Sequence, residues 1–296
     1  MTEFSSGITA GASPSDIVSG PDGALWFAEG TGGVGRITTS GAITQPVTTT
    51  FGNQITVGPD NNLWFTIWHA NGSFPEGIGR VTTGGSFTDF SSGVTPGSFP
   101  YSVTTGPDGD LWFTENTGGG RVGRITTSGV VTEFTAGITS NVSPSTITAG
   151  PDGNLWFTEF NHGVARITTA GMVTEFTSGI SSHALGIAVG PDGALWFAEQ
   201  QPDVIGRITT SGAVTEMTTG ITPSSNLTGI TSGTDGALWF SEQAGNRIGR
   251  ITTGGAVTEY ASGISSGAGP SGLRFGPDGN LWFAESAGNR IGRLIY

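Results

Sequence analysis

One phrase occurs seven times along the chain and limits what the chain can fold into. In the copy from Gly276 to Glu285 it reads Gly-Pro-Asp-Gly-Asn-Leu-Trp-Phe-Ala-Glu. Its first half is typical of a turn, because Pro presets φ, Asp can bond its own backbone and Gly accepts a positive φ. Leu-Trp-Phe then favours a buried strand. The copies begin at Gly20, Gly58, Gly106, Gly150, Gly190, Gly233 and Gly276.

The phrase belongs to a longer unit that repeats about every 42 residues, a length typical of one propeller blade. Each unit holds four short strand patterns separated by turn signals, as in residues 213–217, 228–232, 238–242 and 247–252. The chain is therefore predicted to be all-β, a seven-bladed β-propeller with four antiparallel strands per blade. We expect a single domain over residues 1–296. The units begin at Thr2, Thr44, Thr88, Thr132, Thr174, Thr215 and Thr258.

The two ends of the sequence complement each other. The last unit stops after its third strand pattern at Leu294, whereas residues 2–5 form a fourth strand pattern with nothing before them. We expect residues 2–5 to complete the C-terminal blade, which closes the ring and removes a sheet edge.

Composition excludes several classes of partner. The formal net charge is −12, with 296 residues, no Cys and no Lys among the basic residues. An acidic chain of this kind is a poor ligand for nucleic acid or for an anionic membrane. No apolar run approaches the ~20 residues of a membrane span, and the first residues lack the pattern of a signal peptide. We expect a monomer, in the cytoplasm or as a secreted mature form.

Residues present in every unit are interpreted as structural. The turn Asp of each phrase and the Trp that follows it belong to this group. An Arg recurs in the third strand pattern, where it can lie across the Trp of the paired strand. These Arg residues are Arg36, Arg80, Arg124, Arg166, Arg207, Arg250 and Arg293.

Six units carry a Glu three residues after the Trp, which predicts a ring of acids on one face. Each can be held by the following loop or by an adjacent Arg such as Arg247 or Arg290. A cation or metal near the axis is the alternative, although carboxylates one blade apart are too distant to chelate one ion tightly without a His or water between them. The six are Glu29, Glu115, Glu159, Glu199, Glu242 and Glu285.

Unit two departs from the repeat on that same face. It has Ile67 in place of Glu, followed by the longest loop of its kind. That loop and its neighbour in unit three supply aromatic and polar groups that predict a ligand site, or that simply pack the longer loop. The predicted ligand-binding residues are Trp68, His69, Phe74, Glu76, Phe99 and Tyr101.

The three His residues, His69, His162 and His183, are the most natural candidates for a general base. All three fall in predicted loops on the same face. None has an Asp or Glu partner at a telling sequence spacing, so each is equally well explained as a solvated loop residue.

The recurring Leu-Trp-Phe-Thr/Ala-Glu, Gly-Asn-Arg-Ile-Gly-Arg-Ile-Thr and Thr-Glu-Phe phrases resemble the streptogramin B lyases, the virginiamycin B lyase-like proteins, over essentially the whole length. The resemblance implies a seven-bladed propeller and a magnesium-dependent elimination that opens the lactone of a cyclic depsipeptide antibiotic. It implies Glu242 and Glu285 as acidic strand-end residues and candidate magnesium ligands. The same phrases also occur in propellers without that activity.

The resemblance places the general-base and binding His of the family in Pro-His-x-Ile motifs. None of the matching positions here is His, and His183, two residues before Leu185, is the one conceivable substitute. The seven positions are Ser15, Asn53, Tyr101, Ser145, Leu185, Thr228 and Ser271.

Three functions remain open from the sequence. The first is a propeller that binds a small molecule or a protein through the loops of one face. The second is a magnesium-dependent C–O lyase acting on type B streptogramins, with His183, Glu242 and Glu285 as its candidate catalytic residues. The third is a repeat scaffold without a specific site.

Overall fold

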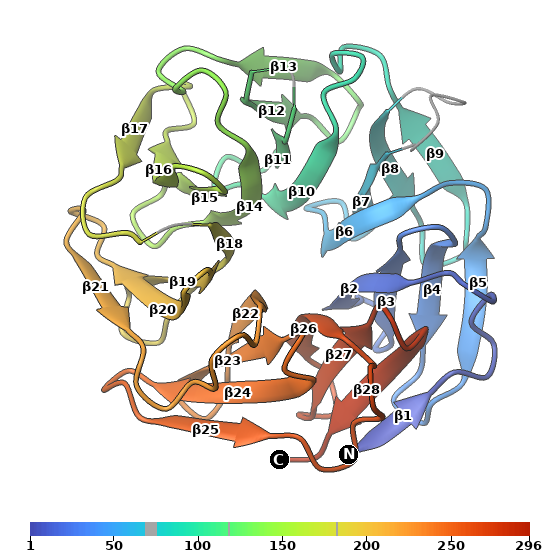
Figure 1. Ribbon diagram of the computed structural model, residues 1–296. Helices are drawn as coiled ribbons and strands as arrows, with labels where there is room; N and C mark the ends of the chain where they lie inside the picture. Colours follow the sequence, from blue (N-terminus) through green and yellow to red (C-terminus); the bar gives the residue numbers. More distant parts are fainter. Residues whose placement is uncertain (69–75, 118, 182) are drawn as a thin grey trace.

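The computed structural model is a ring of seven four-stranded antiparallel sheets (Figure 1). It describes residues 1–68, 76–117, 119–181 and 183–296. The predicted all-β, seven-bladed propeller is confirmed. Among the described residues, no helix is long and apolar enough to cross a membrane.

Each blade runs outward from the axis in chain order, through four neighbouring strands. The innermost strands are β2 (Pro14–Ser19), β6 (Gly52–Val57), β10 (Pro100–Thr105), β14 (Pro144–Ala149), β18 (Ala184–Val189), β22 (Leu227–Ser232) and β26 (Pro270–Phe275). The second strands are β3 (Leu25–Glu29), β7 (Leu63–Ile67), β11 (Leu111–Glu115), β15 (Leu155–Glu159), β19 (Leu195–Gln200), β23 (Ala237–Glu242) and β27 (Leu281–Glu285).

The third strands are β4 (Gly33–Ile37), β8 (Gly77–Val81), β12 (Arg121–Ile125), β16 (Gly163–Ile167), β20 (Asp203–Ile208), β24 (Arg247–Thr252) and β28 (Arg290–Leu294). The outer strands are β5 (Ile43–Val47), β9 (Phe87–Phe90), β13 (Val131–Phe134), β17 (Val173–Phe176), β21 (Val214–Met217), β25 (Val257–Tyr260) and β1 (Thr2–Phe4). Blades are numbered one to seven below, beginning with β2–β5 and ending with β26–β28 plus β1.

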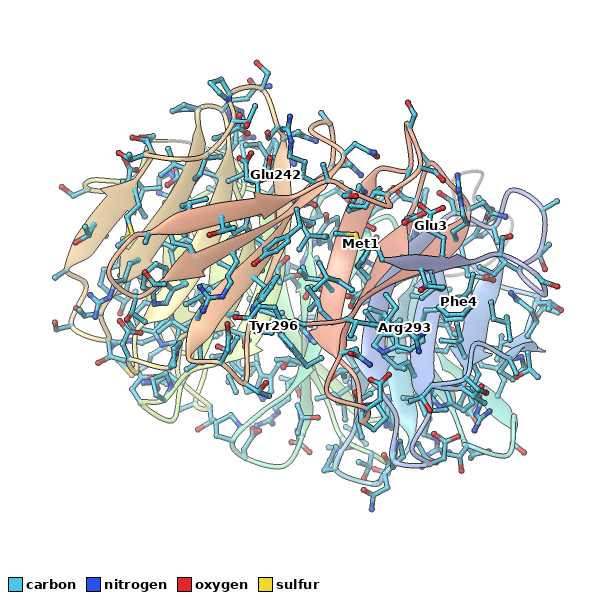
Figure 2. The ribbon with its side chains drawn as sticks, turned by 90° about the horizontal axis from the view of Figure 1, so that it is seen from below. Met1, Glu3, Phe4, Glu242, Arg293 and Tyr296 are labelled. Atoms are coloured by element: carbon cyan, nitrogen blue, oxygen red, sulfur yellow. The ribbon has the colours of Figure 1, made fainter. Side chains whose placement is uncertain are left out.

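Blade seven is completed by the start of the chain. Thr2 pairs with Arg293 and Phe4 pairs with Ile291, so β1 lies antiparallel to β28 (Figure 2). The Phe4 ring stacks on Trp282 at a centroid distance of 5.4 Å. The predicted closure is confirmed, with the strand ending at Phe4.

The core consists of seven similar layers between neighbouring blades. Trp26 of blade one packs in one cluster with Leu63 and Phe65 of blade two, and Trp64 in turn packs with Leu111 and Phe113 of blade three. All of these side chains are fully buried. The Leu-Trp-Phe strand therefore packs between blades, as the sequence predicts, and the hydrophobic effect joins each blade to the next.

The repeated Asp, Trp and Arg form one contact group per blade. In blade one, the Trp26 Nε1–H donates to Asp22 Oδ1 at 3.0 Å, and Arg36 Nε lies 2.7 Å from Asp22 Oδ2. The Arg36 guanidinium lies over the Trp26 ring at 6.0 Å. The Trp-to-Asp bond and the Arg–Asp contact occur in all seven blades. The structural interpretation of these residues is confirmed.

Candidate functional site

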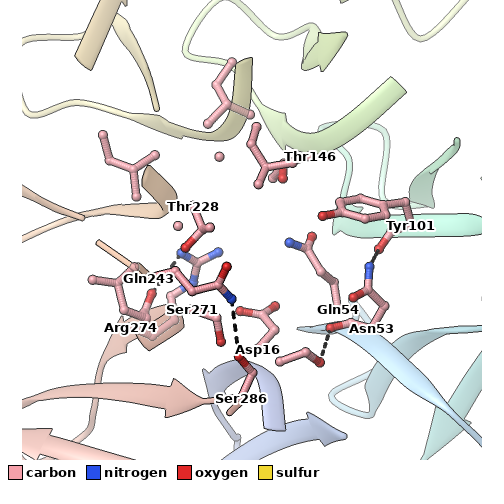
Figure 3. A pocket seen from close by; sticks show the side chains of 18 of the residues that line it. Asp16, Asn53, Gln54, Tyr101, Thr146, Thr228, Gln243, Ser271, Arg274 and Ser286 are labelled. Carbon is pink, nitrogen blue, oxygen red and sulfur yellow. Dashed lines mark hydrogen bonds between the residues drawn. The ribbon is translucent and has the colours of Figure 1, made fainter. Parts of the chain in front are cut away.

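Every innermost strand begins with a shift in register against the second strand. Such a bulge re-aims the side chains around it. The second residue of each innermost strand lies within this bulge, and these are the positions that the resemblance matches to the His of the family. Six of the seven, Ser15, Asn53, Tyr101, Leu185, Thr228 and Ser271, line a shared pocket at the centre of the ring (Figure 3).

This axial pocket has a volume of about 320 Å³. Gln200, Gln243 and Ser286 also line it, and each of them directly follows the strand-end Glu of its blade. The pocket therefore opens on the face to which the Glu-bearing strand ends point.

Ten of the nineteen described residues that line the axial pocket carry a hydroxyl or amide side chain. The Asn53 side-chain amide donates to the Tyr101 carbonyl at 2.8 Å, and Ser15 Oγ donates to the Asn53 carbonyl at 2.6 Å. Gln243 Nε2 donates to Ser286 Oγ at 3.3 Å. Figure 3 shows Gln54 and the Tyr101 hydroxyl pointing into the open centre. These groups are held in place by neighbouring blades and can both donate and accept hydrogen bonds.

Two charged residues line the deeper part of the pocket. Asp16 is 7% exposed, and its Oδ2 accepts a bond from the Ile55 amide at 3.2 Å. Burial raises the pKa of Asp16, although the charge of Arg274 acts in the opposite direction. Burial, and then the charge of Asp16, raise the pKa of the Tyr101 hydroxyl, which favours its proton-donating form.

Asp16 and Arg274 were not among the residues predicted from the sequence. A signal for them was present, because both depart from the small or hydroxyl-bearing residues of most innermost strands. Arg274 pairs with Trp282 in blade seven. In blades two and three, the residues that pair with the corresponding Trp are Thr56 and Thr104.

The predicted aromatic site is only partly connected to this pocket. Tyr101 lines it. The half-buried Trp68 instead contacts Phe99 at a ring distance of 6.0 Å, and Glu76 Oε2 accepts a bond from the Phe99 amide at 2.9 Å. The other two predicted residues, His69 and Phe74, lie outside the described residues. Ligand binding by this group of six stays a prediction.

Glu242 and Glu285 are fully buried and are not lining residues of the pocket. Glu242 Oε2 accepts a bond from Ser225 Oγ at 2.7 Å and lies 3.5 Å from Arg247 NH1. Glu285 Oε2 lies 3.6 Å from Arg290 Nε.

Burial raises the pKa of Glu242 to about 7 and that of Glu285 to about 8. Magnesium prefers accessible, ionised oxygen ligands. The two acids would have to become exposed and ionised to bind magnesium, and magnesium binding by this pair stays a prediction.

Two of the three His residues lie in the described part of the chain. His183 precedes the lining residue Leu185 by two positions, and its ring packs edge-on against Phe160 at 4.8 Å. His162 Nε2 lies 3.4 Å from Glu175 Oε2. No sequence spacing indicated this acidic partner, because Glu175 comes from the adjacent outer strand β17.

The chain matches a protein family and several solved structures. A model of the virginiamycin B lyase family matches residues 73–220 and 186–296. The chain is 37% identical to the crystal structure of a selenomethionine-substituted virginiamycin B lyase from Staphylococcus aureus, with a TM-score of 0.88 over 99% of both chains. No curated protein sequence matches.

Two further solved structures extend this similarity. A streptogramin B lyase structure is 34% identical, with a TM-score of 0.86 over 99% of this chain and 96% of that one. A catalytically inactive His-to-Ala variant of virginiamycin B lyase from Staphylococcus aureus, with quinupristin, is 37% identical, with a TM-score of 0.86 over 99% of both chains.

Proposed function

The chain belongs to the virginiamycin B lyase family, and from this premise we propose that it binds a neutral, amide-rich small molecule in the axial pocket without cleaving it. One observation carries the proposal. Five of the six innermost-strand positions that converge on the pocket bear a hydroxyl, amide or phenol group, Leu185 being the sixth, and no imidazole is among the described residues that line it.

The chemistry of the lining supports this ligand class. Hydroxyls and side-chain amides such as those of Thr228, Asn53 and Gln243 match the N–H and C=O groups of a peptide backbone. Neutral hydroxyls and amides are poor bases for removing a carbon-bound proton at neutral pH. The formal net charge of −12 disfavours an anionic ligand. Quinupristin, present with the inactive lyase variant, is therefore the first ligand to test.

A lyase is the second candidate, and the close similarity to virginiamycin B lyase favours it. His183 is the described imidazole nearest in sequence to a lining residue. If His183 acts as the base, it must move away from the Phe160 ring towards Leu185. Glu242 and Glu285 would also have to leave their Arg partners before they could bind magnesium.

Titration calorimetry with quinupristin, with and without magnesium, tests the proposal. We expect saturable binding, and unchanged ligand by chromatography and mass spectrometry after long incubation at high protein concentration. Thr228→Val removes one pocket hydroxyl and should weaken binding by about 3- to 10-fold. Thr39→Val, in the turn between β4 and β5 on the opposite face, is the matched control and should bind like wild type.

Chromatographic retention has to be measured as well as mass, because elimination opens the antibiotic ring without changing its mass. Linearisation that is lost in His183→Ala would establish the second candidate and overturn the first. Absence of any binding would reject the proposed ligand class.

A further inference from the structure

A pair of carboxylates recurs at the outer part of several blades, on the face of the axial pocket. One comes from the end of the second strand and the other from the outer strand. In blade three, Arg121 Nε lies 4.0 Å from Glu115 Oε2 and 3.7 Å from Glu133 Oε2. Blades six and seven repeat this arrangement with Arg247 and Arg290. In these three blades a guanidinium supplies the positive charge between two acids.

Blade four keeps the two carboxylates and loses the guanidinium. The residue that faces Glu159 across the sheet is Gly163, whereas Arg121 faces Glu115. The imidazole of His162 takes the place beside the acids. One of its ring nitrogens, one oxygen of Glu159 and one oxygen of Glu175 all lie within 4.8 Å of one another.

The Glu159 carboxylate is the second observation that points to a ligand. Its residue is 0% exposed, and in the described part of the chain neither of its oxygens accepts a hydrogen bond. The same holds for Glu115 and Glu285, but an Arg nitrogen lies within 4.0 Å of each of those two carboxylates. Glu175 differs, because Thr139 donates to it from its amide at 2.6 Å and from its hydroxyl at 2.7 Å. Burial, and then the charge of Glu175, raise the pKa of Glu159 to about 8, so this carboxyl holds a proton at neutral pH that a bound cation has to displace. A cation beside Glu159 would favour its ionised form, as the guanidinium does in the Arg-bridged blades.

We propose that Glu159, His162 and Glu175 bind a divalent transition-metal ion of the zinc class. One imidazole nitrogen and two carboxylate oxygens form a donor set that zinc accepts, with metal–ligand distances of about 2.0–2.2 Å. Imidazole favours zinc over magnesium. His162 Nε2 and Glu175 Oε2, 3.4 Å apart, already have about the spacing of two ligands in a tetrahedral site.

Access to this site is from solvent. The side chains of His162 and Glu175 are 29% and 17% exposed, so an ion can reach the cluster without opening the core. Three protein ligands leave one position for water, as in open zinc sites. The cluster lies on blade four away from the axis, and the proposal does not depend on what the axial pocket binds.

Cobalt(II) and zinc titrations of the chelator-treated full-length protein test the proposal. We expect one equivalent of cobalt with visible absorption bands typical of low coordination, displaced by zinc and not by magnesium. His162→Gln and Glu159→Gln should each weaken zinc binding by at least about tenfold. Glu115→Gln is the matched control, because it alters the same strand position in an Arg-bridged blade, and it should bind zinc like wild type.

A second readout does not need a variant. The imidazole nitrogen resonances of His162 in the wild-type protein should shift on addition of one equivalent of zinc, while those of His183 should not. Failure of the wild type to bind a stoichiometric ion would overturn the proposal. Binding that His162→Gln and Glu159→Gln leave unchanged would do the same.

Discussion

Glu29 isolates the effect of burying a strand-end acid, because no Arg lies beside it. The residue is 0% exposed and faces Gly33 across the sheet. Gln45 Nε2 donates to its Oε1 at 2.7 Å, while its Oε2 accepts no hydrogen bond in the described part of the chain. Burial raises the pKa of Glu29 to about 7, against the opposing effect of the Gln45 bond. The folded state therefore favours the protonated carboxyl.

Glu29→Gln should change how stability depends on pH. Protonated Glu29 contributes to the stability of the folded state. This contribution is fully present below pH 4.5 and is lost as the pH rises through about 7. The variant stays neutral, so we expect its unfolding free energy to exceed that of wild type by roughly 2–3 kcal/mol at pH 9. Urea unfolding at pH 5 and pH 9 measures this difference. Equal losses of stability in the two proteins over that range would contradict the prediction.

At the scale of the element, the turn between the innermost and second strands is held by its Asp. In blade six, Asp235 accepts from Trp239 Nε1 at 3.3 Å and from Arg250 Nε at 2.6 Å. Burial acts to raise the pKa of Asp235, but these bonds, that from Arg250 first, lower it overall. The Asp thus connects the turn, the core Trp and the third strand.

Asp235→Ala should lower the unfolding free energy by about 1–3 kcal/mol, because the Trp239 N–H loses its acceptor and Arg250 loses its counter-charge. Asp110→Ala serves as the control, since Asp110 follows a turn of the same kind and accepts no Trp bond. For Asp110→Ala we expect the unfolding free energy to change by no more than about 0.5 kcal/mol. Chemical denaturation of both variants at pH 7 provides the comparison, and similar losses in the two would disprove the role of the Asp–Trp bond.

The sequence was most informative about these elements and least informative about their register. The turn phrase and the strand patterns come from local composition, which is why the blades were predicted. The bulge at Ser15 and its six equivalents depends on pairing with the second strand, and local composition does not specify that pairing. Asp16 borders the bulge of β2, whereas Arg274 lies beyond the bulge of β26, opposite Trp282. Both differ from the residues at the equivalent positions, but that difference alone does not say that the two side chains line a pocket.

At the scale of the molecule, the ring is completed without a covalent link between β1 and β28. Hydrogen bonds, the Phe4–Trp282 stack and the Arg290–Glu3 contact of 2.7 Å hold β1 in place. The orphan strand pattern at the start of the chain was enough to predict this closure. The Glu159–His162–Glu175 cluster was not predictable in the same way. Glu159 and His162 come from β15 and the loop after it, and Glu175 comes from the outer strand β17, which meets them only in the folded sheet.

Phe4→Ala should loosen the closure more than the same change inside a continuous blade. We expect the unfolding free energy to fall by about 2–3 kcal/mol and backbone amides along β28 to exchange at least about tenfold faster. Phe90→Ala is the control, since Phe90 stacks on Trp64 at 5.3 Å within blade two. Hydrogen exchange read by residue compares β28 with β8, and equal acceleration of the two strands would show that the closure is no weaker than any other blade.

The repetition of the core also gives the molecule an optical property. Seven of its eight Trp residues are fully buried in near-identical surroundings, each with an Asp acceptor at the indole N–H. Their emission therefore forms a uniform, solvent-shielded background. Trp68 differs, because it is half-buried among the rings of Phe51 and Phe99 in the loops of blades two and three. A change at these loops would be visible in the fluorescence of this one indole, so the protein carries its own reporter without any added label.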